Sequence, residues 1–459
     1  MPAAIWFVCA GVYCATVGPR LLEVSPDDHY SHLAESWLAG QLHVLDNQPD
    51  GTNDWACYDT ELQQSCPLGN FRRGGERYRW YVSFPPFPAA VVLPAVAVWG
   101  TELPDRLFWA LVAAFAPMFL FLLLRRLRER GYSVRTTREN LLLTALFAFG
   151  SVFYFVAVQG TVWFAAHVCA VSLLALYLYW GLEARRPVAA GWMLGLAFLC
   201  RPTVAFLALF FGVEALRMSR PSLSGEKAED SNPARGPLSK ALLWLGAVRW
   251  RRVWKPVALF SAPILVCGAV AMWMNYARFE NPFEWGHSHL QIVWRARIER
   301  WGLFNYHFLP RNLAVFVASL PWIMSAAPYV KVSQHGLALW FTTPNLLGVL
   351  WPRPDRAPVG ESVLRPVLVA CWMAILPVMI TNLMYQNSGW VQFGYRFALD
   401  YMVFLFALLA MTGRRFGVGF ILLMIFAIAV NTFGAITFDR AWEFYGGDGT
   451  QNILFQPDR

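Results

Sequence analysis

The sequence predicts an all-α protein, a polytopic bundle of transmembrane helices. Two features of the composition support this class: 57% of the residues are hydrophobic and only 15% are charged. Soluble domains carry about 25% charged residues, so this chain has too little charge to cover a water-soluble surface of its size. Apolar runs approach the length that spans a bilayer, and we count about 11–13 such segments. A transmembrane β-barrel would need alternating polar and apolar residues, which runs such as residues 421–426 lack.

The net charge of +9 does not indicate nucleic-acid binding. Its sources are short arginine clusters between apolar segments, as at residues 125–138, and this pattern is typical of cytoplasmic loops. We therefore expect membrane lipids, and no nucleic acid, among the partners. The first apolar segment, residues 3–18, lacks the basic leader of a cleaved signal peptide and is predicted to remain as a helix.

Residues 1–217 are predicted to form an N-terminal transmembrane module. Its first outer loop, residues 19–83, contains an amphipathic interfacial helix at about residues 30–40. The next apolar segment, residues 84–100, carries four prolines, which remove backbone donors, so we expect a half-span or an interfacial hairpin there. The module continues with apolar segments at residues 107–124, 141–158, 162–180, 188–199 and 204–216.

Residues 218–255 are predicted to be a cytoplasmic basic loop. Its first part, residues 219–237, is polar and rich in proline and serine, which predicts disorder. Its second part, residues 240–255, mixes leucine and tryptophan with arginine and predicts an interfacial helix attracted to anionic lipids.

Residues 256–459 are predicted to form a C-terminal transmembrane module. It contains a second outer loop, residues 275–336, with an interfacial helix at residues 311–320, and an outer tail that starts at residue 439. Apolar segments are expected at residues 256–274, 337–350, 363–383, 397–411 and 420–430.

Two of the eight cysteines, Cys57 and Cys66, lie in the first outer loop. A disulfide between them would place this loop in an oxidising compartment, and the alternative is two free thiols. The other six cysteines lie in or beside apolar segments and are interpreted as small buried hydrophobic residues.

The acidic pair Asp27–Asp28 directly follows the first apolar segment. Two adjacent carboxylates can supply a general base with an orienting partner, or can hold a divalent cation. Their mutual repulsion raises the pKa of one of them. The structural alternative is that an aspartate caps the N-terminus of the helix at residues 30–40.

Further motifs follow this pair in a particular order. They are Tyr30, Ala34 and Gly40 on the interfacial helix, the proline-rich start at residues 84–88, the turn Arg201-Pro202-Thr203, and Gly394-Tyr395-Arg396-Phe397. The order resembles the polyprenyl-phosphate-dependent glycosyltransferases of the GT-C superfamily, which include protein O-mannosyltransferases and lipid A aminoarabinose transferases. The resemblance covers most of the chain, and its signal is the order of motifs that are individually weak.

The resemblance implies a polyprenyl-phosphate-linked sugar donor, an acceptor that is a lipid, a glycan or a protein, and an inverting transfer. It implies an extracytoplasmic site in a bacterial inner membrane, with Asp27 or Asp28 as the general base. Such an enzyme would require no cofactor, with a divalent cation as a weaker option.

One departure from the family pattern concerns the outer turn at residues 158–163. Many relatives carry a further acidic residue there, and this chain has none. His167 could replace it as a polar contact, or could be a hydrogen-bonded packing residue. The departure keeps one other function open, a catalytically inactive assembly subunit. A further alternative is a lipid-linked glycan flippase, which would need polar residues along a midplane path, and the apolar spans carry few charges there.

Several other polar residues are candidates for substrate binding. The planar guanidinium suits phosphate, so Arg201, Arg278 and Arg396 are predicted donor contacts. His29 and Tyr30 would shape the acceptor side, and His287 is a further candidate. The alternatives are an aromatic belt with snorkelling arginines for the outer loop, and an Arg396–Asp400 pair along one helix. His287 and His289 lack a third ligand, so no metal site is predicted.

Overall fold

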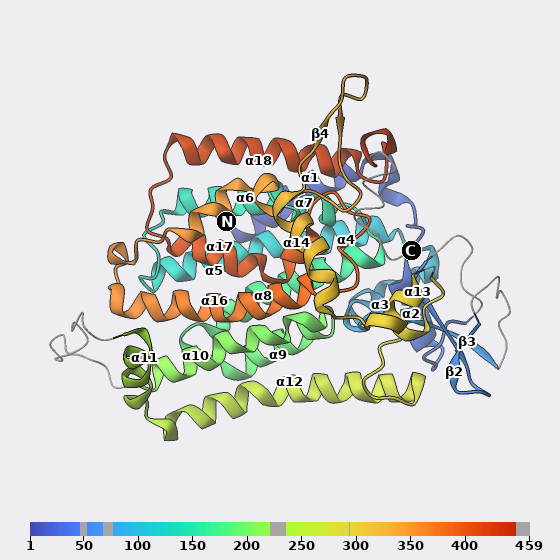
Figure 1. Cartoon of the computed structure of the whole chain (residues 1–459), viewed down its shortest axis with the longest axis horizontal. Helices are drawn as coiled ribbons and strands as arrows, with labels where there is room; N and C mark the ends of the chain where they lie inside the picture. The colour runs from blue at the N-terminus through green and yellow to red at the C-terminus, as the bar shows by residue number, and fades with distance from the viewer. Residues whose placement is uncertain (46–52, 68–76, 221–235, 293, 447–459) are drawn as a thin grey trace.

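The structure is a computed structural model, and it describes residues 1–45, 53–67, 77–220, 236–292 and 294–446 (Figure 1). The expected disorder at residues 219–237 and the outer tail lie largely outside the described residues. The predicted fold class is confirmed, because helices form most of the described chain and run roughly parallel in a bundle.

Among the described residues, six helical stretches are long and apolar enough to cross a membrane. They comprise α1 (Pro2–Val17), α4 (Asp105–Ala113) with α5 (Phe115–Glu129), α8 (Val162–Gly181), α12 (Trp250–Phe279), α16 (Glu361–Leu383) and α18 (Val418–Thr437). Two further apolar helices, α3 (Phe87–Trp99) and α9 (Pro187–Phe198), are shorter. The proline-rich segment forms one helix of 13 residues, α3, with Pro94 inside it, so the alternative of a hairpin is not formed.

Several predicted spans are broken into shorter pieces. Residues 141–158 divide into α6 (Thr137–Phe149) and α7 (Phe153–Ala157) around Gly150. Residues 204–216 become a 3₁₀ turn, η4 (Pro202–Leu207), and α10 (Ala208–Met218). Residues 337–350 become α15 (Leu339–Thr342) and η8 (Pro344–Leu350). Proline at the start of η4 and of η8 fixes φ and removes a backbone donor, which favours a new helical segment at these points.

The centre of the bundle is formed by α8 and α17 (Leu399–Met411). Every residue of α17 is buried, and α8 is buried along most of its length. Apart from Asp400 in its first turn, α17 is apolar on all sides, and this reflects a position inside the protein and not contact with lipid.

Helices α9 and α12 approach closely through two glycines. A Cβ atom at Gly191 would overlap the carbonyl oxygen of Phe260, and one at Gly195 would lie 2.8 Å from Cys267 Sγ. Small residues four positions apart allow two membrane helices to pack with their backbones close together. The predicted interfacial helix at residues 240–255 is divided between two helices. Helix α11 ends at Gly246, and residues 250–255 form the first turns of α12.

A three-stranded antiparallel sheet in the first outer loop was not predicted. Its order is β2 (Gln64–Ser65), β1 (Trp55–Asp59) and β3 (Tyr78–Val82). The Cys57–Cys66 disulfide is confirmed and joins β1 to the residue after β2, with the two Cα atoms 5.4 Å apart.

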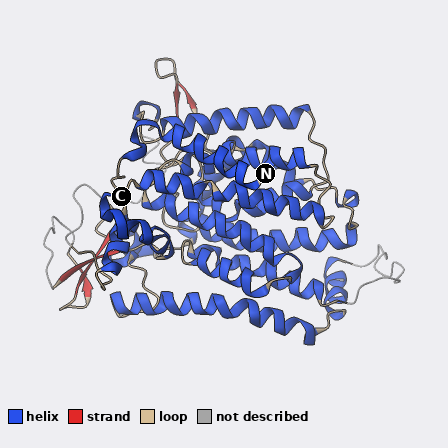
Figure 2. Cartoon of the chain, turned by 180° about the vertical axis from the view of Figure 1, so that it is seen from behind, coloured by secondary structure: helices blue, strands red, loops and turns tan. Residues whose placement is uncertain are grey.

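The two ends of the bundle differ. One end carries the sheet, α2 (His29–Leu38), α13 (Arg295–Trp301) and a small hairpin of β4 (Trp322–Ile323) and β5 (Val330–Lys331), and the opposite end carries α11 (Pro237–Gly246) (Figure 1). Seen from behind, the three-stranded sheet again lies at one end, and the hairpin projects from the long edge of the bundle in the half nearer that end (Figure 2). We call this the sheet end of the bundle. Helix α14 (Leu309–Ala318) begins two residues earlier than its predicted start.

Candidate functional site

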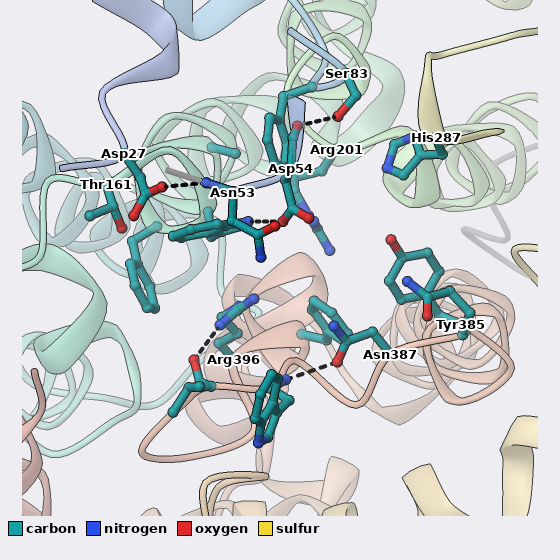
Figure 3. Close-up of a pocket in the computed structure, with 18 of the residues that line it drawn as sticks. Asp27, Asn53, Asp54, Ser83, Thr161, Arg201, His287, Tyr385, Asn387 and Arg396 are labelled. Carbon is teal, nitrogen blue, oxygen red and sulfur yellow. Dashed lines mark hydrogen bonds between the residues drawn. The ribbon is translucent and has the colours of Figure 1, made fainter. Parts of the chain in front are cut away.

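A cavity of about 390 Å³ opens at the sheet end of the bundle. Its walls come from the first outer loop, the start of α8, the α9–η4 turn, the loop after α12 and the loop after α16. Four of the predicted site residues line it, namely Asp27, Arg201, His287 and Arg396. Figure 3 shows Asp27, Asn53 and Asp54 on one side, facing Arg396 and Asn387 on the other.

Asp27 is held by hydrogen bonds from Val162, the first residue of α8, and from Asn53. Its carbonyl oxygen accepts a 3.0 Å hydrogen bond from the Val162 amide. Its carboxylate Oδ1 accepts a 3.4 Å bond from the Asn53 amide. Burial raises the pKa of Asp27 to about 6, and the nearby negative charges of Asp54 and Asp28 act in the same direction. A carboxylate with a pKa close to neutral is suited to accept a proton from a substrate hydroxyl.

Asp28 does not line the cavity. Its carboxylate lies 3.3 Å from Nε2 of His32, one turn along α2. It occupies the N-cap position of α2, but its side chain makes no capping hydrogen bond. The two adjacent aspartates, which could not be distinguished in the sequence, therefore differ in position.

Asp54 is a second cavity carboxylate that the sequence analysis missed. Its Oδ2 accepts a 2.7 Å hydrogen bond from Nε1 of Trp163, and its carbonyl oxygen accepts one of 3.2 Å from the hydroxyl of Ser83. Burial raises the pKa of Asp54. Residues 158–163, which include Trp163, contain no acidic residue of their own, so this segment binds a carboxylate that another loop supplies.

Arg201 lies in the cavity wall but its charge is already neutralised. Its Nε and Nη2 each donate a 3.0 Å hydrogen bond to the carboxylate of Asp400. The same carboxylate accepts hydrogen bonds from Thr203 and Asn382. The alternative in which Asp400 pairs with Arg396 along one helix is not formed, because the carboxylate of Asp400 is bound by Arg201 and Thr203 of the α9–η4 turn.

Arg396 is buried in the wall beside aromatic rings. Its Nη1 donates a 3.0 Å bond to the carbonyl oxygen of Val391, and its guanidinium lies 5.1 Å from the centroid of the Phe164 ring. Among the described residues no carboxylate forms an ion pair with it, and its Nε is buried without a hydrogen-bond acceptor. The negative charges of Asp54 and Asp400 act on this guanidinium, but neither carboxylate contacts it directly. A buried guanidinium without a direct ion pair is suited to an anionic ligand.

His287 lines the cavity opposite the acidic loop (Figure 3). Burial lowers its pKa to about 4, because charging the ring inside the protein is unfavourable. At neutral pH this histidine is therefore an uncharged contact. His289 instead donates to or accepts from the hydroxyl of Ser65 at 2.6 Å, and stacks on Phe279.

Four other predicted site residues lie behind the cavity wall. His29 stacks on Trp55 with ring centroids 4.1 Å apart, and its Nε2 lies 2.7 Å from the carbonyl oxygen of Asn53. Tyr30 is buried in the core. His167 lies with its Nδ1 3.3 Å from the Asp400 carboxylate. Arg278 donates a 2.8 Å bond to the carbonyl oxygen of Val82, so it ties α12 to β3.

The remaining cavity residues come from the segment that follows α16. Tyr385 and Asn387 line the cavity together with Trp390. The Asn387 side-chain oxygen accepts bonds from the amides of Gly389 and Trp390, both 2.9 Å, and so fixes this loop. Three residues separate the segment 385–390 from the motif that begins at Gly394. The position of this segment next to the motif was the sequence signal that could have identified it.

Within the described ranges no cluster of three or more histidine, cysteine, aspartate or glutamate side chains is arranged to hold a metal ion. Three carboxylates line the cavity, those of Asp27, Asp54 and Asp439, and Asp439 is already paired with Arg20 at 2.9 Å. Asp27 and Asp54 are therefore the cavity carboxylates without an arginine ion pair that could contact a cation. A divalent cation would need further ligands from substrate or water.

No family model and no curated protein matches the chain. Among solved structures, the apo crystal structure of the oligosaccharyltransferase of Archaeoglobus fulgidus is similar, with 12% identity and a TM-score of 0.40. That match covers 100% of this chain and 58% of the oligosaccharyltransferase chain, so the chain spans less than two thirds of that protein's length.

Proposed function

We propose that the protein is a membrane glycosyltransferase that moves a sugar from a polyprenyl-phosphate donor to an acceptor hydroxyl. The observation that carries the proposal is the placement of Asp27, whose carboxyl has a pKa of about 6, across one cavity from the unneutralised Arg396. A general base and an anion contact facing each other are what such a transfer requires.

In the proposed reaction, the carboxylate of Asp27 accepts the proton of the acceptor hydroxyl. The freed oxygen attacks the anomeric carbon of the donor sugar and forms the new glycosidic bond. The bond from that carbon to the phosphate oxygen breaks, and polyprenyl phosphate leaves with the electron pair. Attack from the face opposite the leaving group inverts the anomeric configuration.

Arg396 would stabilise the departing phosphate through its guanidinium. Asp54, held by Trp163, is placed to accept hydrogen bonds from sugar hydroxyls, and Asn387 lies on the opposite wall. The guanidinium of Arg201 is already hydrogen-bonded to the Asp400 carboxylate. Arg201 would therefore hold the cavity wall in place and would not contact the phosphate directly. The acceptor class and the sugar stay open in this proposal.

The proposal places the sheet end of the bundle outside a bacterial inner membrane. The disulfide in the sheet supports this side, because disulfides persist in oxidising compartments. The cavity opens at the same end, where a donor anchored in the outer leaflet could reach it.

The proposal is tested with purified protein in proteoliposomes that contain polyprenyl phosphates carrying radiolabelled mannose, glucose or galactose. The expected result is release of polyprenyl phosphate and transfer of label, with loss of about 1,000-fold or more in rate for Asp27→Asn. Asp28→Asn is the matched control, because Asp28 lies one residue away and outside the cavity.

Three outcomes would contradict the proposal. Donor that crosses the bilayer unchanged would indicate a flippase. Binding of polyprenyl phosphate without any turnover would indicate an inactive subunit. Full turnover by Asp27→Asn would remove Asp27 as the base.

A further inference from the structure

The β4–β5 hairpin, residues 320–331, is a feature that the proposed transfer does not use. The hairpin projects from the sheet end, across the direction of the transmembrane helices and beside the end of α18 (Figure 1). Its two strands pair antiparallel, with Trp322 opposite Lys331 and Ile323 opposite Val330. The Met324 amide donates a 2.8 Å bond to the Tyr329 carbonyl oxygen, which closes the tip.

The base of the hairpin is fixed to the bundle. The Val332 amide donates to the carbonyl oxygen of Phe444, and the Gly446 amide donates to that of Val332. Both partners follow the end of α18 at Thr437. On the other side, the Ala338 amide donates to the carbonyl oxygen of Ser319. These hydrogen bonds fix the position of the hairpin relative to the end of α18.

The tip of the hairpin is apolar and uncovered. Residues 323–327 are all exposed, and the exposed fraction is 81% for Ile323 and 62% for Tyr329. Residues 300–354 contain no aspartate or glutamate, so the tip carries no acidic side chain that would be repelled by phospholipid headgroups. A two-stranded hairpin alone is marginally stable in water, so an apolar tip of this kind needs a partner.

We propose that the β4–β5 hairpin inserts its tip into the boundary between headgroups and acyl chains of the bilayer at the sheet end. The hairpin adjoins other exposed apolar side chains on neighbouring helices. These are Leu313 and Val317 on α14, both more than 40% exposed, and Ile436 at the end of α18, which is 52% exposed. Trp322 and Tyr329 are amphipathic rings of the kind enriched at this boundary, and Lys331 stands at the base, where its charge can reach phosphate.

The hairpin thereby sets the bilayer level relative to the cavity. The helix before it, α14, is tied to the cavity wall, since Nδ2 of Asn312 donates to the carbonyl oxygens of Leu383 and Tyr385 at 2.9 and 2.7 Å. Tyr385 lines the cavity. A hairpin held in the membrane surface would keep this wall at the depth of the lipid headgroups.

The experiment attaches an environment-sensitive NBD fluorophore at Met324→Cys in proteoliposomes of phosphatidylethanolamine and phosphatidylglycerol. Leu62→Cys, 58% exposed at the turn of the three-stranded sheet, is the water-facing control, and Leu265→Cys, 70% exposed in the middle of α12, is the lipid-facing control. Unsubstituted protein treated with the same fluorophore measures the background labelling of the native cysteine thiols. Quenching is measured with aqueous iodide and with lipids that carry a nitroxide at the headgroup or deep in the chain.

We expect iodide to quench the fluorophore at position 324 about threefold or more weakly than that at position 62, with strong quenching by the headgroup nitroxide. Adding Ile323→Glu should raise iodide quenching at position 324, because a charge at the tip opposes insertion. Equal iodide quenching at positions 324 and 62 would overturn the proposal. So would protection from iodide without nitroxide quenching, which would indicate contact with a second copy or another protein. None of these readouts depends on sugar transfer.

Discussion

Asp27 and Arg396 show how the surroundings of a side chain decide its chemistry. Asp27 and Asp28 are identical neighbours in the sequence, yet one faces the cavity and the other faces His32. Arg201 and Arg396 line one cavity, yet Asp400 neutralises the first and no described carboxylate pairs with the second. The residue pattern showed the acidic pair and the arginines, but the direction of each side chain depends on contacts with distant segments. Asp54 was missed for the same reason, because its partner Trp163 lies more than a hundred residues away.

Replacement of Arg396 tests the anion contact. Arg396→Gln should lower kcat/KM by about 100-fold or more, because a buried positive charge is removed from the leaving phosphate. Arg396→Lys should recover part of this loss, since it restores the charge but not the planar fork. Binding of unlabelled polyprenyl phosphate should weaken in parallel. The control is Arg300→Gln, an exposed arginine on α13. Equal binding by wild type and Arg396→Gln would contradict the assigned role.

The pH dependence of transfer tests the protonation state of Asp27. Its pKa of about 6 lies above the ordinary aspartate value, so the carboxyl becomes protonated, and inactive as a base, as the pH falls through 6. We expect kcat/KM to fall about tenfold per pH unit below that value and to level off above it. Asp28→Asn should keep this acidic limb. A profile without any change near this pKa would count against Asp27 as the base.

At the scale of elements, apolar composition identified helical segments but not their partners. The sequence of α17 is as apolar as a lipid-facing span, and burial on all sides gives the same composition. Breaks at Gly150, Pro202 and Pro344 agree with known effects of glycine and proline, although tertiary contacts decide whether such a residue ends a helix. The sheet went undetected because its strands are short and pair across residues far apart in the loop.

The close approach of α9 and α12 gives a prediction for stability. Gly191→Ala should destabilise the protein by about 1–3 kcal/mol, because the added methyl group overlaps the carbonyl oxygen of Phe260 and forces the helices apart. Gly212→Ala on α10 is the matched control, since nothing lies within 4 Å of its Cβ position. That change should be neutral or slightly stabilising, because alanine favours helix over glycine. Thermal unfolding in detergent measures both, and equal melting temperatures for the two variants would refute the packing argument.

For the whole molecule, Asp400 joins parts of the chain that are far apart in sequence. Its carboxylate accepts hydrogen bonds from Arg201 and Thr203 at the α9–η4 turn and from Asn382 at the end of α16. His167 of α8 lies beside it. This buried group connects the two predicted transmembrane modules directly beneath the cavity, so the modules share one polar centre.

Removal of this charge should loosen the bundle. Asp400→Asn should lower the free energy of unfolding by about 3–5 kcal/mol, because it leaves the guanidinium of Arg201 buried without a counter-charge. Combining it with Arg201→Gln should restore part of the loss. Asp439→Asn, which breaks the partly exposed pair with Arg20, should cost less than about 1 kcal/mol. Similar losses for Asp400→Asn and Asp439→Asn in detergent melts would argue against a central role for Asp400.

The sequence by itself determined that the protein is a helical membrane bundle, because low charge and long apolar runs leave few other ways to satisfy the backbone in lipid. It also determined which polar residues stand near the ends of helices, and it indicated the pairing of Cys57 with Cys66. Only the tertiary structure decided that Asp27 and not Asp28 faces the cavity, that Asp54 joins it, and that Arg396 lacks a carboxylate among the described residues. These outcomes depend on contacts between segments that are distant along the chain, and local sequence patterns do not encode such contacts.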